Sequence, residues 1–167
     1  IKNDNNNLKI EELINKLKTA RRPIIYAGSG IRASKTHKLL IRFAEELNIP
    51  IVTSWNSNDL IWDEHPLNSG RPGTVGTRTG NYAVQTSDLL LVLGTRLNIR
   101  QVSYNWESFA DKAWICHVDI DNSELEKPTL NQDLKIQMDL KDFFDNFFKF
   151  NLNCLKEDKK KQWQKWS

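Results

Sequence analysis

The chain has 167 residues, of which 39% are hydrophobic and 27% charged, and its formal net charge is +3 at pH 7. This length suits one domain with a core of ordinary size, and the composition is that of a globular protein. The small positive excess gives no reason to expect nucleic acid as a partner. No apolar run is long enough to span a membrane, and we interpret the basic run at residues 156–165 as a solvated helix or linker.

Helix and strand patterns alternate along the chain. Apolar residues at helical spacing predict a first helix at residues 10–17, and a short apolar run predicts a first strand at residues 24–27. The elements predicted after them are, in order, a helix at 34–47, a strand at 49–53, a helix at 77–86, a strand at 89–93, a helical turn at 106–110, a strand at 114–120, a strand at 134–138 and a helix at 140–150. This alternation predicts an α/β fold with a parallel sheet, right-handed crossovers and helices on both faces.

We interpret the two ends of the chain as junctions to a longer polypeptide. Residues 1–9 are polar, contain no signal-peptide pattern and are typical of a linker from a missing N-terminal domain. Residues 10–150 are expected to form the domain itself. Residues 151–167 are expected to form a linker or helix toward a missing C-terminal domain.

Several conspicuous residues are interpreted as structural. Four phenylalanines at helical spacing near the end of the chain predict core packing rather than a ligand site, namely Phe143, Phe144, Phe147 and Phe148. Cys116 and Cys154 fit no metal-ligand spacing, and Cys116 lies in an apolar strand pattern, so we expect a buried thiol and a reducing, cytoplasmic compartment. The three histidines, His37, His65 and His117, form no metal or catalytic-triad pattern.

A glycine-rich turn follows the first predicted strand. Residues 28–33, which begin Gly28-Ser29-Gly30, match the G-x-G-x-x-G/A form of a dinucleotide-binding turn. Such glycines permit a tight turn and let backbone N–H groups approach a phosphate at a helix N-terminus. However, the acidic residue that would hold the ribose is replaced by Thr53-Ser54-Trp55. The motif alone therefore predicts a phosphate site and a ligand-free turn about equally.

The segment after the apolar run at residues 89–93 is the strongest indication of a ligand. Gly94 to Arg96 follow a strand that is predicted to be buried on both faces, and ligands bind at the carboxyl edge of such sheets. Arg96 and Arg100 are natural partners for phosphate or carboxylate groups. The alternative is a surface or interdomain salt bridge, which we favour for Arg100.

Two further segments allow both a ligand and a structural interpretation. Gly73, Gly76 and Gly80 crowd the start of a helix, so either a ligand approaches the backbone there or the loop requires positive φ angles. Asp119 and Asp121 end a buried strand, where a carboxylate could accept hydrogen bonds from a ribose or an adenine amino group. The same carboxylates could instead cap the turn that follows.

Taken together, these segments resemble the central domain of the thiamine-diphosphate-dependent enzymes, in their acetolactate synthase-like branch. The resemblance covers roughly residues 10–148, and it rests on the order and spacing of several motifs. These are Arg22-Pro23-Ile24-Ile25-Tyr26-Ala27-Gly28-Ser29-Gly30, His65-Pro66-Leu67, Gly73-Thr74-Val75-Gly76, Asn81-Tyr82-Ala83-Val84, Ser87-Asp88-Leu89-Leu90-Leu91-Val92-Leu93-Gly94-Thr95-Arg96 and His117-Val118-Asp119-Ile120-Asp121.

The resemblance implies a Rossmann-like sheet of about six parallel strands, set as the middle domain of a three-domain enzyme. In that family a glutamate of the first domain activates the cofactor, and a Gly-Asp-Gly…Asn motif in the third holds thiamine diphosphate and Mg²⁺. The chain contains no Gly-Asp-Gly and is expected to be catalytically silent alone. The parent would be a cytoplasmic homodimer or homotetramer with lyase or transferase activity, and we expect no nucleic acid or membrane partner.

The resemblance also implies a nucleotide groove, which holds FAD in acetolactate synthases and ADP or nothing in other relatives. FAD-binding relatives carry Gly-x-Arg-Phe-Asp-Asp-Arg, but here Asn98 and Ile99 replace both acidic residues, and Val75 replaces a family histidine. FAD is therefore expected to bind weakly or not at all, and any bound nucleotide to place its phosphates near residues 28–30 or 73–76. The residues implied at the nucleotide are Gly28, Ser29, Gly30, Thr53, Ser54, Gly73, Gly76, Gly94, Arg96, Arg100, Asp119, Asp121 and Asp139.

Two other functions remain open at this point. The first is a ligand-free scaffold that joins two catalytic domains and packs a dimer, which the aromatic end at Trp163 and Trp166 would suit. The second is an NAD-dependent deacylase of the sirtuin type, whose glycine loop resembles residues 28–30. That alternative would need a four-cysteine zinc module, and the chain has only two cysteines.

Overall fold

Five parallel strands form a single sheet in the computed structural model, which describes residues 2–155. The sheet has the order β2-β1-β3-β4-β5, as a doubly wound α/β domain requires. Its strands are β1 (Pro23–Ala27), β2 (Ile51–Thr53), β3 (Leu89–Leu93), β4 (Trp114–Asp119) and β5 (Leu134–Gln137). The predicted Rossmann-like class is confirmed, with five strands in the described residues rather than about six.

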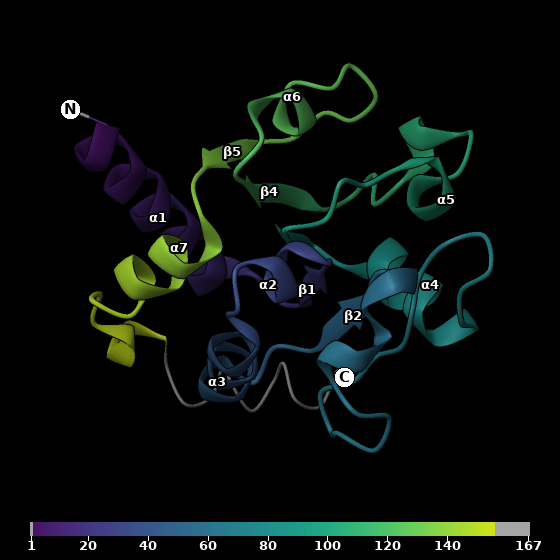
Figure 1. The fold of residues 1–167 in the computed structure, drawn as a ribbon, viewed down its shortest axis with the longest axis horizontal. Coiled ribbons are helices and arrows are strands. Elements are labelled where there is room, and N and C mark those ends of the chain that lie inside the picture. Colours follow the sequence, from purple (N-terminus) through teal and green to yellow (C-terminus); the bar gives the residue numbers. More distant parts are fainter. Residues whose placement is uncertain (1, 156–167) are drawn as a thin grey trace.

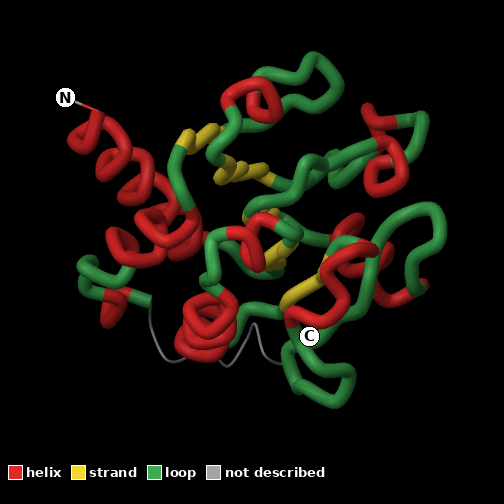
Figure 2. Tube along the Cα trace, viewed as in Figure 1, coloured by secondary structure: helices red, strands yellow, loops and turns green. Residues whose placement is uncertain are grey.

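Helices cover both faces of the sheet. Figure 1 shows α1, α3 and α7 on one side of the line of strands and α4, α5 and α6 on the other. The helices are α1 (Lys2–Thr19), α2 (Gly30–Ala33), α3 (His37–Leu47), α4 (Arg78–Thr86), α5 (Ile99–Val102), α6 (Asn122–Leu125) and α7 (Leu140–Phe147), with short 3₁₀ turns η1 (Trp55–Leu60), η2 (Trp106–Ser108) and η3 (Leu152–Cys154). In Figure 2 the helices on the second side are short and joined by long loops.

The larger core lies between the sheet and the helices α1, α3 and α7. Phe43 of α3 packs against three fully buried phenylalanines of α7, and its ring centroid lies 4.7 Å from that of Phe147. The predicted role of the phenylalanine stripe as core is therefore confirmed. Cys116 of β4 is a fully buried free thiol in this core, as predicted, and burial raises its pKa.

The second face of the sheet carries a smaller core that contains buried polar groups. Tyr26, Val92 and His117 lie in register on β1, β3 and β4, and all three are fully buried. The Tyr26 hydroxyl and both ring nitrogens of His117 have no hydrogen-bond partner within the described residues. Burial raises the pKa of Tyr26 and lowers that of His117, because desolvation disfavours each charged form.

The starts of two helices differ from the predicted ones. The first helix begins at Lys2 rather than near Ile10, so residues 2–9, interpreted as linker, continue the helix that Ile10 and Leu13 anchor in the core. Extending an existing helix requires no new nucleation, so polar residues can adopt it. The helix predicted at 34–47 begins at His37 rather than Ser34, and Lys35, with a positive φ of 57°, separates it from the short helix α2 that precedes it.

The short helix α5 was missing from the predicted elements. Its signal is a capping box, in which the Asn98 side chain accepts from the Arg100 N–H and the Gln101 side chain accepts from the Asn98 N–H. No helix among the described residues is long and apolar enough to cross a membrane. The predictions for residues 156–165, Trp163 and Trp166 lie outside the described residues.

Candidate ligand site at the carboxyl ends of the strands

The topology places a crevice at the carboxyl ends of β1 and β3. The chain runs from β1 to β2 on one side and then crosses back to β3 on the other side of β1, so this is the switch point at which open α/β sheets bind ligands. Gly28 follows β1 and Gly94 follows β3. The topology therefore brings two of the predicted glycine loops together, although they are distant in sequence.

The two glycine loops at this point pack directly against each other. A Cβ added to Gly28 would lie 2.3 Å from the carbonyl oxygen of Gly94, and one added to Gly30 would lie 2.7 Å from the Gly94 Cα. The N–H groups of Gly28 and Gly30 donate to the carbonyls of Leu93 and Gly94, each at 2.9 Å. Close packing of the two loops thus explains why these positions are glycines. Two of the three backbone N–H groups that were predicted to face a phosphate already donate to backbone carbonyls.

A pocket of about 260 Å³ opens beside these loops. It brings Gly30 and Gly94 together with Asp119 and Asp139, four of the residues predicted to contact a nucleotide. Asp119 is buried and accepts from the Asp121 N–H at 2.9 Å, and Asp139 caps α7 by accepting from the Lys141 N–H at 2.7 Å. The pocket is therefore acidic.

Two other predicted residues have structural partners near this pocket but do not line it. Asp121 caps α6 by accepting from the Ser123 N–H at 2.8 Å, as the structural alternative expected. Arg96 is mostly exposed, and its Nε donates to Glu124 of α6 at 2.8 Å. Lys127 pairs with the same carboxylate. Arg96 therefore takes part in a surface salt bridge rather than facing the strand ends.

Three other predicted residues meet at a second pocket, of about 310 Å³, between the glycine loop at 70–77 and α5. Gly73, Gly76 and Arg100 line it, together with Arg71 and Trp55. The two pockets have no described lining residue in common. Seven of the predicted nucleotide residues are thus divided between an acidic pocket and a basic one, and the others line neither.

Hydrogen bonds hold the glycine loop in one conformation. Gly73 has a φ of 126°, and its N–H donates to the Asn81 side chain at 2.8 Å. The Thr74 N–H donates to the Arg100 carbonyl at 2.9 Å, which ties the loop to α5. Thr53 lies behind the loop, where its N–H donates to the Gly70 carbonyl at 3.1 Å and its side chain is buried.

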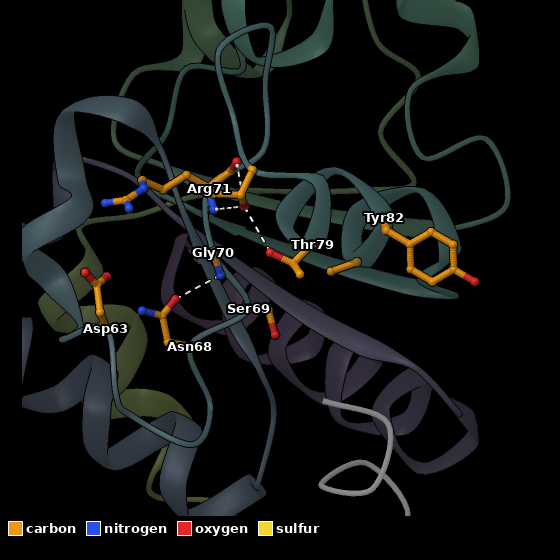
Figure 3. Close-up of a pocket in the computed structure, with 9 residues that line it drawn as sticks. Asp63, Asn68, Ser69, Gly70, Arg71, Thr79 and Tyr82 are labelled. Carbon is orange, nitrogen blue, oxygen red and sulfur yellow. Dashed lines mark hydrogen bonds between the residues drawn. The ribbon is translucent and has the colours of Figure 1, made fainter.

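Arg71 is the functional candidate that the sequence patterns did not identify. It lines the basic pocket and also a neighbouring pocket of about 400 Å³, shown in Figure 3, whose walls include Asp63 and Tyr82. Thr77 fixes its backbone, because the Thr77 hydroxyl accepts from the Arg71 N–H at 3.1 Å. The only available signal was a basic residue between glycines, which is too common to be specific.

The described residues do not fit thiamine diphosphate and its metal. Within residues 2–155, no three His, Cys, Asp or Glu side chains are grouped so that they could hold a metal ion. The chain also lacks the Gly-Asp-Gly motif. A diphosphate–Mg²⁺ site would need such oxygen ligands, so it has no place among these residues.

The fold, with its parallel sheet and its glycines at the strand ends, defines a Rossmann-like α/β domain. A family model described as "Thiamine pyrophosphate enzyme, central domain" matches residues 10–147. The chain therefore belongs to this family, as its central domain. The match confirms the predicted resemblance and does not support the sirtuin-type alternative.

Individual relatives agree with this assignment. A "Probable acetolactate synthase large subunit" of Methanococcus aeolicus is 38% identical over 133 residues, which are 80% of this chain and 22% of that protein. An "Acetolactate synthase large subunit" of Corynebacterium glutamicum is 36% identical over 71% of this chain and 19% of its own length. "Probable acetolactate synthase 2, chloroplastic" of Oryza sativa subsp. japonica is 42% identical over 71% of this chain and 17% of its own length. The chain thus spans about a fifth of these relatives.

Proposed function

We propose that the chain is the nucleotide-binding-like, structural central domain of a thiamine-diphosphate-dependent carboligase or decarboxylase, a lyase or transferase that resembles acetolactate synthase. The match over residues 10–147 to a central domain carries this proposal. Thiamine diphosphate and Mg²⁺ would be held by the other domains of the same polypeptide, in a homodimer or homotetramer. A cytoplasmic location is proposed because the free thiol of Cys116 suits a reducing compartment.

The isolated chain is expected to fold and to show no carboligase or decarboxylase activity. Its described residues supply a complete sheet but no metal cluster for the cofactor. The measurement is an assay with pyruvate, thiamine diphosphate and Mg²⁺, with circular dichroism to show that the chain is folded. Turnover above a blank without protein would contradict the assignment as a non-catalytic domain.

FAD is expected to bind weakly or not at all. The strand-end pocket and the basic pocket are separate, and Asn98 and Ile99 offer no carboxylate to a flavin nucleotide. A hydrogen bond to a charged group contributes roughly 1.5–3 kcal/mol, so loss of one such acceptor weakens binding about tenfold or more. The purified chain should lack flavin absorbance, and titration with FAD should show little binding.

A restoring variant makes the FAD test specific. Asn98 and Ile99 are exposed, so Asn98→Asp combined with Ile99→Asp should leave the fold intact and strengthen FAD binding about tenfold. ADP is titrated in parallel, with its phosphates expected at residues 28–30 or 73–76. A yellow parent protein with stoichiometric flavin would show that the present residues suffice.

The ligand-free scaffold remains the second candidate, and one observation favours it. Gly28, Gly30 and Gly94 are accounted for by their mutual contact, without any phosphate. If neither FAD nor ADP binds, the domain serves to position its neighbours in the parent enzyme.

A further inference from the structure

The pocket in Figure 3 lies between residues 63–71 and the helix α4. Its volume of about 400 Å³ is within the range of small-molecule sites. Its described lining residues include one acidic and one basic side chain, Asp63 and Arg71, and the others are uncharged. Because the two charges balance, the pocket favours a neutral ligand over a simple cation or anion.

Three polar side chains of this pocket are free to bind a ligand. Those of Asp63, Ser69 and Arg71 form no hydrogen bond or ion pair with another of the described residues. Figure 3 shows the Asp63 carboxylate and the Arg71 guanidinium at the same end of the pocket, with no bond between them. By comparison, Arg42 and Glu46 form an ion pair at 2.6 Å.

The free groups differ in what they can bind. A carboxylate only accepts hydrogen bonds, a guanidinium only donates them, and a hydroxyl does both. Two adjacent hydroxyls on a ligand satisfy the charged pair, because their protons are donated to Asp63 while their oxygens accept from Arg71. The Thr79 hydroxyl donates to Thr77 Oγ1 at 3.1 Å and keeps its lone pairs for a further donor. The lining therefore matches a ligand that carries several hydroxyls.

The other end of the pocket is aromatic. Tyr82 of α4 is 69% exposed, and Figure 3 shows it at the end opposite Asp63. Its ring combines an apolar face with a polar hydroxyl. A sugar ring is amphipathic in the same way, since its C–H groups form an apolar face and its hydroxyls lie around the edge. One sugar can therefore contact the tyrosine ring and the charged pair together.

The floor of the pocket is held in place by the neighbouring strand β2. The Ser69 N–H donates to the Ile51 carbonyl at 2.8 Å, and the Gly70 carbonyl accepts from the Thr53 N–H at 3.1 Å. The Asn68 side chain accepts from the Gly70 N–H at 2.9 Å. A floor that is fixed before binding loses little conformational entropy when a ligand arrives.

We propose that this pocket binds a neutral, polyhydroxylated ligand of the sugar type, with adjacent hydroxyls between Asp63 and Arg71 and its C–H face toward Tyr82. The pocket shares no described lining residue with the acidic pocket at the strand ends. The inference goes beyond the proposed function and does not rest on it, so its failure would leave the domain assignment unchanged.

The test is an NMR titration of the complete 167-residue chain with the neutral methyl glycosides of glucose, galactose and mannose, each added separately. We expect at least one of them to give saturable shifts of the backbone amide signals of Ser69, Gly70 and Thr79 and of the Tyr82 ring signals. No saturable shift with any glycoside up to about 100 mM, a concentration that detects even Kd values near 10 mM, would overturn the proposal.

Two other probes separate the hydroxyl edge from the alternatives. Cyclohexanol retains a six-membered ring but has one hydroxyl, so it should bind more weakly than the preferred glycoside. Free alanine is a zwitterion that would pair its ammonium group with Asp63 and its carboxylate with Arg71. Tighter binding of either probe than of every glycoside would overturn the proposal, because apolar contact or charge would then select the ligand.

Matched variants locate the site. Asp63→Asn should weaken binding of the preferred glycoside about tenfold, because a hydrogen bond to a charged acceptor is lost. Glu64→Gln removes the neighbouring exposed carboxylate, which does not line the pocket, and should leave binding unchanged.

The aromatic wall is tested in the same way. Tyr82→Ala should weaken glycoside binding several-fold, whereas Tyr104→Ala removes a ring that is 81% exposed and outside the pocket and should have no effect. All four substituted side chains are exposed, so the folds should be retained, and the amide spectra of the free variants check this. Equal changes in each variant and its control would overturn the proposal.

Discussion

Gly28→Ala is expected to destabilise the domain by about 3 kcal/mol, the upper part of the range for overpacking a buried site. The new methyl group would lie 2.3 Å from both the Gly94 carbonyl oxygen and the Thr95 Cβ. Because the obstacle includes backbone, relief requires the β1 and β3 loops to separate. That movement would weaken the 2.9 Å hydrogen bonds from Gly28 to Leu93 and from Gly30 to Gly94.

The measurement is thermal or urea unfolding of the variant and its parent. For a domain of this size, 3 kcal/mol corresponds to a fall in Tm of about 6–12 °C. Ser29→Ala is the control, because Ser29 is exposed in the same turn and its side chain makes no capping hydrogen bond. Its stability should change by less than about 0.5 kcal/mol. An unchanged Tm for Gly28→Ala would show that the loops are not tightly packed.

The strands were predictable because parallel strands buried on both faces consist of continuous apolar residues. The runs around Ile24 and Leu91 show this directly, and both residues are fully or almost fully buried. The polar start of α1 was not predictable in this way. Its helical conformation depends on the anchoring of Ile10 and Leu13 in the core, and residues 2–9 themselves carry no apolar periodicity.

Several residues that line the two pockets were named from the sequence, but Arg71 and the arrangement of the pockets were not. Glycines after β1 and β3 are typical of a phosphate site, yet Gly28 and Gly94 are required by their contact with each other. That contact joins loops far apart in sequence, so no local pattern reveals it. The division into an acidic and a basic pocket also depends on segments that are far apart in sequence and meet only in the fold. Arg71 lines the same pocket as Arg100, whose carbonyl accepts from the Thr74 N–H, so this pocket too depends on a contact between separate segments.

The buried imidazole of His117 makes stability depend on pH. Burial lowers its pKa in the folded state, although the carboxylate of Asp119, with Oδ2 3.9 Å from Nε2, acts in the opposite direction. Gln132, Thr95 and Glu124 also favour the charged form of the ring, less strongly, although none of them meets hydrogen-bond geometry with a ring nitrogen. Lys135 is opposite His117 in β5, where it pairs with Glu126, and Tyr26 is two strands away.

The direction of this pH dependence follows from proton binding in the folded and unfolded states. The unfolded chain takes up a proton at the ordinary histidine pKa near 6.5, whereas the folded chain resists it. The free energy of unfolding is therefore unaffected by this group well above pH 6.5 and falls as the pH decreases below that value. One such histidine lowers the free energy of unfolding by at most about 2 kcal/mol between pH 6.5 and pH 5.

His117→Leu is expected to flatten this dependence. The variant removes the titrating group together with two buried ring nitrogens that lack hydrogen-bond partners within the described residues, so it should match or exceed the parent in stability at pH 7. At pH 5 it should exceed the parent by up to about 2 kcal/mol more than at pH 7. Urea unfolding at pH 7, 6 and 5 measures both differences.

Asp119→Asn provides the matched control for the same measurement. The amide oxygen can still accept from the Asp121 N–H, but the charge that favours a protonated His117 is removed. The pKa of His117 in the folded state should then fall further, so the loss of stability between pH 7 and pH 5 should be at least as steep as in the parent. If His117→Leu retains the full pH dependence of the parent, the acid sensitivity of the domain originates at another group.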